Sequence, residues 1–300
     1  MNVARTIKAD QPTFVIIRFW LPFMAPCLGS IAKLIKRNTN IKVIAITDNI
    51  IPHEKRPGDV GLTKFFIKHV DGFVTMSKAV LKELEEFTNS ANKVFLPHPI
   101  YDIFGSKMNK IEAQTSLGLS TNDKHILFFG FIRKYKGLDL LLNALADNRI
   151  KELGVKLIIA GEFYDEEQPY IDLMQSLGID DRVILKTSFI PKEEVAKYFC
   201  ASDMVTQTYR TASQSGVTQI AYHFNRPMLV TDTGGLSEIV PHNKVGYVTA
   251  INPQAIADAI VDFYSNNKET EFSEAVAIEK ERFTWRKFIE GIQYLYDRLN

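Results

Sequence analysis

The feature of this sequence that most restricts its fold is a repeated alternation of short, continuous apolar runs with helical segments. Strands that are buried on both faces produce continuous apolar runs, whereas strands with one solvated face alternate apolar and polar residues. Buried runs separated by helices are typical of a parallel, doubly wound α/β sheet. In the first third of the chain, the predicted strands are residues 14–18, 41–47, 72–76 and 93–96.

The alternation restarts after residues 97–110, a stretch with prolines, a glycine and few periodic positions, which indicates a linker. The strands predicted after it are residues 125–129, 155–160, 182–185, 204–208, 228–231 and 246–248, and the helices include residues 138–145, 170–177, 191–199, 217–223 and 253–264. The pattern predicts three parts: residues 1–108, residues 109–282, and a helical tail at 283–300. Four strands are few for a doubly wound domain, so we expect the first domain to be incomplete, as if its first βα units were absent.

Composition and charge bear on which partners the protein binds and in which cellular compartment it works. The net charge is +1, so the chain lacks the basic field of a nucleic-acid-binding protein and no nucleic-acid partner is predicted. Cys27 and Cys200 lie far apart in apolar surroundings, which predicts two buried thiols in a reducing compartment. Arg18, Lys33 and two prolines interrupt residues 14–35, so no uniform apolar span of about 20 residues is present. The N-terminus also lacks a secretory signal, and we therefore expect a cytoplasmic protein.

A basic loop follows the first strand of the second domain. The strand runs into Gly130, and Arg133 and Lys136 then precede the next predicted helix. Ligands of open α/β sheets bind at the carboxyl ends of strands. An arginine fork and a lysine point charge together suit a diphosphate. The alternative is an ordinary solvated basic loop, which is the better account of Lys134.

Residues 211–240 contain two turns, at Ser215–Gly216 and Gly234–Gly235, and each leads into a predicted helix. A helix start presents free N–H groups and a positive dipole end, which together bind anions. Two such sites close together suggest a phosphate-bearing ligand. The alternative is a pair of ordinary strand–turn–helix joints, which occur in every α/β domain.

Polar residues also follow two other predicted strands. Glu162 comes after residues 155–160, where a carboxylate either accepts from a ligand hydroxyl or caps a helix. Asp48 and His53 close the second strand of the first domain, although a lone histidine is more often a structural hydrogen bonder. The dinucleotide-binding glycine motif, the P-loop, the Gly-x-Ser-x-Gly elbow and metal-ligand spacings are all absent from the sequence.

Several segments, in order, resemble the glycogen-synthase-like family of retaining glycosyltransferases with the GT-B fold: GFIRKYKGLDLLL, IIAGEF, RPMLVTDTGGLSEIV and KVGYV. The segments TDNIIPHEKRPGD and VTMSKAV are similar to a branch of this family used for bacterial surface polysaccharides. The resemblance covers nearly the whole chain. It implies two facing Rossmann-like domains with a cleft between them, the first domain truncated, and a tail helix that crosses back to that domain.

The resemblance also implies a role for each candidate residue. The substrate would be a nucleotide-diphosphate sugar, with Arg133 and Lys136 on the diphosphate and with Asp48 or His53 on the donor sugar or acceptor. The backbone at Ile190 would face the base. The implied donor contacts are Gly130, Glu162, Ile190, Gln214, Ser215, Gly216, Val217, Thr218, Gln219, Gly234, Gly235 and Glu238. No metal ion or other cofactor is implied, because basic side chains and helix starts neutralise the leaving diphosphate.

The sequence departs from the family pattern at four positions. Many members carry two glutamates eight positions apart, where this chain has Thr211 and Gln219. Phe131 occupies a position that is often arginine, and Asp48 replaces a common histidine. Gln219 can still bond ribose hydroxyls as a neutral donor and acceptor.

The function implied by the resemblance is transfer of a sugar, with retention, to a hydroxyl of a surface glycan or lipid-linked acceptor. Lipid-linked acceptors would bring the protein into peripheral contact with the inner membrane face. Two alternatives stay open. A non-catalytic scaffold or partner subunit is favoured by the missing βα units and the two lost glutamates. A nucleotide-sugar epimerase would need acid and base carboxylates, which these losses remove.

Overall fold

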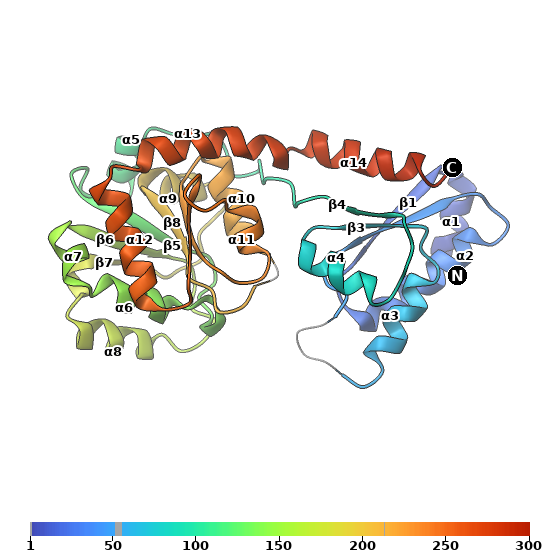
Figure 1. Ribbon diagram of the computed structural model, residues 1–300, viewed down its shortest axis with the longest axis horizontal. Coiled ribbons are helices and arrows are strands. Elements are labelled where there is room, and N and C mark those ends of the chain that lie inside the picture. Colours follow the sequence, from blue (N-terminus) through green and yellow to red (C-terminus); the bar gives the residue numbers. More distant parts are fainter. Residues whose placement is uncertain (1, 52–55, 213) are drawn as a thin grey trace. The chain divides into compact units, whose positions relative to one another are not determined.

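The computed structural model describes residues 2–51, 56–212 and 214–300, which form two compact α/β units (Figure 1). Unit 1 comprises Met1–Pro99 and Phe283–Asn300, and unit 2 comprises Ile100–Arg282. Every strand pair in both sheets is parallel. The α/β class and the parallel sheets predicted from the continuous apolar runs are therefore confirmed.

Unit 1 has a sheet in the order β1-β2-β3-β4. The strands are β1 (Phe14–Phe19), β2 (Lys42–Thr47), β3 (Gly72–Thr75) and β4 (Lys93–Phe95). The helices are α1 (Asn2–Asp10), η1 (Pro22–Met24), α2 (Ala25–Lys36), α3 (Asp59–Ile67), α4 (Lys78–Glu85) and α14 (Trp285–Asp297). Ser77 caps α4 as predicted, since its hydroxyl accepts from the Val80 N–H at 3.2 Å.

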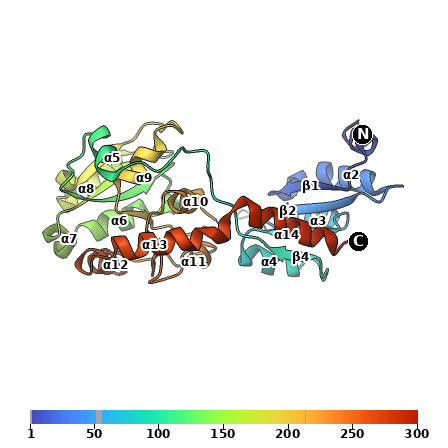
Figure 2. The ribbon, with the colours of Figure 1, turned by 90° about the horizontal axis from the view of Figure 1, so that it is seen from above.

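Two apolar clusters hold unit 1 together. In the first, Phe19 of β1 stacks on Phe66 of α3 with ring centroids 4.2 Å apart, and buried residues of α2 complete the cluster. In the second, Val74 of β3 packs in one cluster with Ile292 and Leu295 of α14. The tail helix is therefore part of the core of unit 1, and Figure 2 shows it running along the sheet.

Unit 2 has a sheet in the order β10-β9-β8-β5-β6-β7. The strands are β5 (Lys124–Phe129), β6 (Val155–Ala160), β7 (Val183–Lys186), β8 (Met204–Gln207), β9 (Met228–Thr231) and β10 (Gly246–Thr249). The helices are α5 (Lys110–Ser116), η2 (Lys134–Lys136), α6 (Leu138–Leu145), α7 (Asn148–Glu152), α8 (Gln168–Leu177), η3 (Asp180–Arg182), α9 (Val195–Ala201), α10 (Gly216–His223), α11 (Leu236–Ile239), α12 (Pro253–Ser265), α13 (Glu269–Glu279) and η4 (Lys280–Phe283), whose last residue belongs to unit 1.

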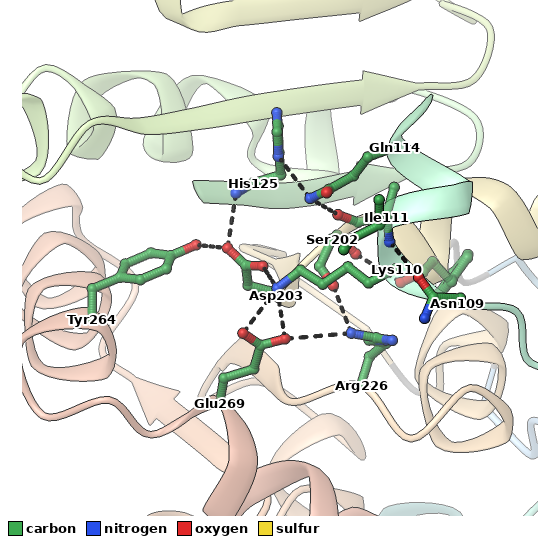
Figure 3. A network of polar contacts seen from close by, with 12 residues as sticks. Asn109, Lys110, Ile111, Gln114, His125, Ser202, Asp203, Arg226, Tyr264 and Glu269 are labelled. Atoms are coloured by element: carbon green, nitrogen blue, oxygen red, sulfur yellow. Dashed lines mark hydrogen bonds and ion pairs between the residues drawn. The ribbon is translucent and has the colours of Figure 1, made fainter. Parts of the chain in front are cut away.

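Besides an apolar core of β5, β6, α6 and α12, unit 2 contains a buried polar network centred on Asp203, at the amino end of β8 (Figure 3). One carboxylate oxygen of Asp203 accepts from the Tyr264 hydroxyl and from the His125 backbone N–H, each at 2.8 Å. The other oxygen pairs with Lys110, which also donates to Glu269 at 2.8 Å. Because a buried carboxylate is stable only when it is paired, this network joins α5, α12 and α13 to the sheet.

The structure differs from the sequence prediction in a few elements. Helices α3, α7 and α13 were not predicted, and α9 begins at Val195 instead of residue 191. The apolar residues of α3 surround the helix instead of forming one stripe, which hides its periodicity. Cys200 is buried as expected, but Cys27 is exposed, because it lies on the solvent side of α2. In the described part of the chain, no helix is both long enough and apolar enough to span a bilayer.

Candidate active site

In the sheet of unit 2, the order in which the chain adds strands reverses between the neighbouring strands β5 and β8. From β5 the chain continues outward through β6 and β7, and from β8 it continues to the other side through β9 and β10. The loops that follow β5 and β8 therefore begin side by side at the carboxyl edge of the sheet and lead to opposite sides of it. In open α/β folds such a switch point is the usual ligand site.

Lys136 brings a positive charge into this switch point. The residue is 8% exposed, and its Nζ lies 5.6 Å from the ring centroid of Tyr209. A Cβ built on Gly130 would lie 3.3 Å from this Nζ and 3.8 Å from Cγ2 of Val217. The ammonium therefore lies near both the end of β5 and the first turn of α10. Burial, followed by the nearby charge of Arg133, lowers the pKa of Lys136 to about 8.

The basic loop is fixed by the strand beside it. Gly137 adopts a left-handed conformation with φ +64°, and the Thr208 hydroxyl donates to its carbonyl at 2.8 Å. Arg210 donates its backbone N–H to the Tyr135 carbonyl at 2.7 Å, and its guanidinium forms a bidentate pair with Asp139. These contacts hold the loop after β5 against the loop after β8.

Arg133 is oriented differently from Lys136. Its guanidinium carbon lies 3.8 Å from the ring centroid of Tyr164, so the fork stacks on an exposed tyrosine. Its charge is nevertheless close enough to Lys136 to lower the pKa of that ammonium. The structure thus groups the two predicted basic residues electrostatically, with Lys136 buried at the switch point and Arg133 on the exposed ring of Tyr164.

The first turn of α10 lies near the Lys136 ammonium, and its backbone N–H groups have no side-chain cap. Ser215 precedes the helix in an extended conformation, and no side chain caps the helix start. Its hydroxyl lies 3.4 Å from the Tyr209 hydroxyl, and Gly216 is exposed. Nε2 of Gln214, just before this turn, is buried without a hydrogen-bond partner. A helix start next to a buried ammonium is a favourable place for an anion.

Buried glutamines lie directly behind this helix start. Gln219 is 2% exposed, and neither Nε2 nor Oε1 has a hydrogen-bond partner. Gln207, at the end of β8, accepts from the Thr218 hydroxyl at 3.0 Å, while its Nε2 also lacks a partner. Unpaired buried amides are unfavourable unless a ligand or water satisfies them. Sequence reasoning missed Gln207, although a polar residue that ends a buried strand was a usable signal.

A small apolar pocket of about 140 Å³ adjoins the loop after β5. It contains three predicted donor contacts, Gly130, Glu162 and Ile190, and adds aromatic walls that were not predicted, chiefly Phe131 and Phe189. Both rings are more than half exposed. An aromatic slot of this kind suits a flat heterocycle.

The second glycine turn contacts the segment before α10. Gly235 donates its N–H to the Ala212 carbonyl at 3.3 Å, and Gly234 remains exposed. Glu238 lies half-buried in the four-residue helix α11. The turn is thus near residues 211–212, but α11 is too short to serve as an anion site of its own.

The candidates in the first part of the chain lie in unit 1. Asp48 follows β2 and forms a bidentate pair with Arg18, with distances of 2.7 Å and 3.1 Å. His98, after β4, was not predicted; its Nδ1 donates to the Pro99 carbonyl at 2.7 Å, and burial lowers its pKa. His53 lies outside the described residues.

These features together define a class of protein. Unit 2 is an open parallel sheet whose switch point gathers a buried ammonium, an uncapped helix start and an aromatic slot, which is the chemistry of a nucleotide-binding α/β domain. The sequence profile described as "Glycosyl transferases group 1" matches residues 109–279. The chain therefore belongs to the group 1 glycosyltransferase family.

Individual relatives agree with this family. A D-inositol 3-phosphate glycosyltransferase of Gordonia bronchialis is 28% identical over 201 residues, which are 62% of this chain and 43% of that protein. The spore coat protein SA of Bacillus subtilis is 26% identical over 213 residues, 67% of this chain and 55% of that protein. The chain thus spans about half the length of these relatives.

The solved structure of Anabaena Alr3699/HepE in complex with UDP has a TM-score of 0.79 and 18% identity, covering 99% of this chain and 81% of that one. Together with a sucrose-phosphate synthase from Thermosynechococcus elongatus (TM-score 0.74, 15% identity, 99% and 77% covered), it confirms that the two Rossmann-like units are those of the GT-B fold.

Proposed function

We propose that this protein transfers a sugar from a nucleotide-diphosphate-sugar donor to a hydroxyl of a surface glycan or lipid-linked acceptor, with retention of configuration. The observation that carries the proposal is the buried ammonium of Lys136 beside the uncapped start of α10. Within the described residues, no carboxylate pairs with this ammonium. A buried cation without a counter-ion is unfavourable, and a diphosphate supplies the missing charge.

The donor contacts follow from this placement. Lys136 and the N–H groups of residues 215–218 bind the diphosphate, and Arg133 turns away from the Tyr164 ring to add a bidentate contact. The Gly234–Gly235 turn and Glu238 bind the sugar. The unpaired amide of Gln219 bonds the ribose hydroxyls, and the base enters the slot formed by Phe131, Phe189 and Ile190.

In the proposed reaction, the bond between the anomeric carbon and the diphosphate oxygen breaks, and the oxygen keeps the electron pair. The acceptor hydroxyl forms the new bond on the same face of the sugar. Its proton passes to the leaving diphosphate oxygen. Lys136, Arg133 and the helix start stabilise the negative charge on the departing group, so the reaction needs no metal ion. Asp48 and His53 remain proposed contacts to the donor sugar or acceptor.

A second candidate function is a non-catalytic subunit of the same fold. The ion pair with Arg18 occupies the carboxylate of Asp48, and neutral Thr211 and Gln219 stand where many relatives have glutamates. A protein of this kind would bind the nucleotide without releasing it from a sugar.

Titration calorimetry with UDP and GDP tests the donor site. We expect one of them to bind the full chain, with affinity lowered roughly 10- to 100-fold in Lys136→Ala, as for a lost charge-assisted hydrogen bond. Arg133→Ala should lose less. Lys134→Ala is the matched control, because Lys134 lies in the same loop with an exposed side chain, and it should bind like the wild type. Absence of binding to both nucleotides by folded protein would refute the donor site.

Release of nucleotide from UDP-glucose or GDP-mannose in the absence of an acceptor separates the two functions. An enzyme transfers the sugar slowly to water and releases UDP or GDP, and Lys136→Ala should abolish that release. Tight nucleotide binding without any release would favour the non-catalytic subunit.

A further inference from the structure

Tyr209 is the side chain that connects the two halves of the candidate phosphate site. It follows β8 and is 3% exposed. Its hydroxyl lies 3.4 Å from the Ser215 hydroxyl, directly before α10, while its ring lies 5.6 Å from Nζ of Lys136. No motif in the sequence pointed to this residue.

The backbone of Tyr209 is held independently of its side chain. Its carbonyl accepts from the Thr231 hydroxyl at 2.5 Å, and the next residue, Arg210, donates to the Tyr135 carbonyl. The Tyr135 ring meets the Tyr209 ring edge-on, with centroids 6.0 Å apart. Since β9 and the basic loop fix the main chain, the hydroxyl and the ring can be removed separately.

We propose that Tyr209 is a positioning residue: its ring holds the ammonium of Lys136, and its hydroxyl holds Ser215, in the arrangement that receives the diphosphate. This inference rests on the proposed donor site. A cation within about 6 Å of a ring centroid is attracted by the negative face of the ring, and the attraction grows when the cation is desolvated. Tyr209 thereby replaces part of the hydration that Lys136 loses on burial.

The charge state of Lys136 makes this role measurable. Burial lowers the pKa of Lys136 most, and the charge of Arg133 lowers it further. The phenol of Tyr209 stays neutral, because burial raises its pKa well above the usual value. With the pKa of Lys136 at about 8, UDP affinity should begin to fall as the pH rises through 8, when the free ammonium loses its proton.

The experiment measures UDP affinity of the full chain from pH 7 to about pH 9, where the terminal phosphate is mostly ionised and the uracil ring mostly keeps its N3 proton. Residual titration of UDP itself is common to all variants, so their pH profiles are compared with one another. Tyr209→Leu removes the ring, and we expect the pH at which affinity starts to fall to move down by roughly half a unit to one unit. Tyr209→Phe keeps the ring, so it should keep the wild-type pH profile and bind only about two- to fivefold more weakly. Tyr222→Phe is the matched control, since Tyr222 is a buried tyrosine of α10 whose hydroxyl bonds the Ile239 carbonyl at 2.5 Å.

A series of aromatic analogues at position 209 replaces Tyr209→Leu in this experiment if that variant does not fold. Phenylalanine and its fluorinated analogues at position 209 keep the ring in place while fluorine weakens its negative face. The pH at which UDP affinity starts to fall should decrease with each added fluorine. If that pH stays the same throughout this series, in protein that binds UDP, Tyr209 only fills space. A wild type that binds neither UDP nor GDP would overturn the donor site and this inference together.

Discussion

At the scale of single residues, the buried charge of Lys136 lowers the stability of the fold and, in the proposed function, binds the diphosphate. Its pKa of about 8 lies below the model-peptide value of 10.5, so its charged form destabilises the fold below pH 8, and the penalty fades between pH 8 and 10.5. Lys136→Met removes the charge and keeps most of the volume. We expect the free energy of unfolding at pH 7 to rise by roughly 2–3 kcal/mol, while UDP affinity falls roughly 10- to 100-fold, as in Lys136→Ala.

Urea denaturation measures this change. Lys134→Met is the matched control, because an exposed side chain should alter the free energy of unfolding by no more than about 0.5 kcal/mol. Destabilisation of Lys136→Met would mean that the ammonium is well satisfied without a ligand, contrary to the argument from burial.

Gln219 offers a second test at this scale. Its two unpaired polar atoms are buried, so Gln219→Leu should not lower stability. The same change should weaken UDP binding about tenfold and erase the preference for UDP over 2′,3′-dideoxy-UDP, since the ribose contacts are gone. Inorganic pyrophosphate, which has no ribose, should bind both proteins equally. A preference for UDP that survives in Gln219→Leu would place the ribose elsewhere.

At the scale of elements, a glycine turn sets the position of Lys136. A Cβ on Gly137 would lie 2.1 Å from the Thr208 carbonyl oxygen, and φ is +64°. Gly154 has a similar φ of +70°, but nothing lies within 4 Å of its added Cβ. Gly154→Ala should therefore cost only about 1–2 kcal/mol of backbone strain. Gly137→Ala must also push the loop from β8, so it should cost more and weaken UDP binding. Equal losses of stability would refute this account.

The elements that sequence reasoning predicted well are those with strong local patterns. Strand β6 was predicted to the residue, because its residues are apolar and buried apart from Lys156, as expected for a strand covered on both faces. Helix α13 was missed, since Phe272 and Val276 leave its apolar stripe thin.

In the candidate site, too, features within one segment could be predicted from the sequence, whereas contacts between distant segments could not. The basic loop and both turns were visible as local sequence. The pairing of Lys136 with Tyr209 was not, because it depends on β5 lying beside β8, and β6 and β7 separate these strands along the chain. The partner of Asp48, Arg18, was hidden for the same reason, since it lies across β1 and β2.

At the scale of the whole molecule, each hydrophobic cluster of the described residues draws its members from one unit. The core of unit 2 draws on β5, β6, α6 and α12, whereas the cores of unit 1 draw on its own strands and on α14. Both ends of the chain therefore contribute to unit 1, and unit 2 lies between them in sequence. Separate cores predict two separable unfolding transitions, each sensitive to changes within its own unit.

Differential scanning calorimetry can assign the two transitions. Leu295 of α14 is fully buried, so Leu295→Ala should destabilise unit 1 by about 2–4 kcal/mol and lower its transition alone. Ile289→Ala is the control, because Ile289 lies on the same helix and is 60% exposed. UDP at about 100 times its Kd should stabilise unit 2 by about 2.7 kcal/mol and raise only the other transition. The two effects should add in Leu295→Ala with UDP present, because they act on different cores. A single transition, or a UDP-induced shift of the one that Leu295→Ala lowers, would show that the units unfold together.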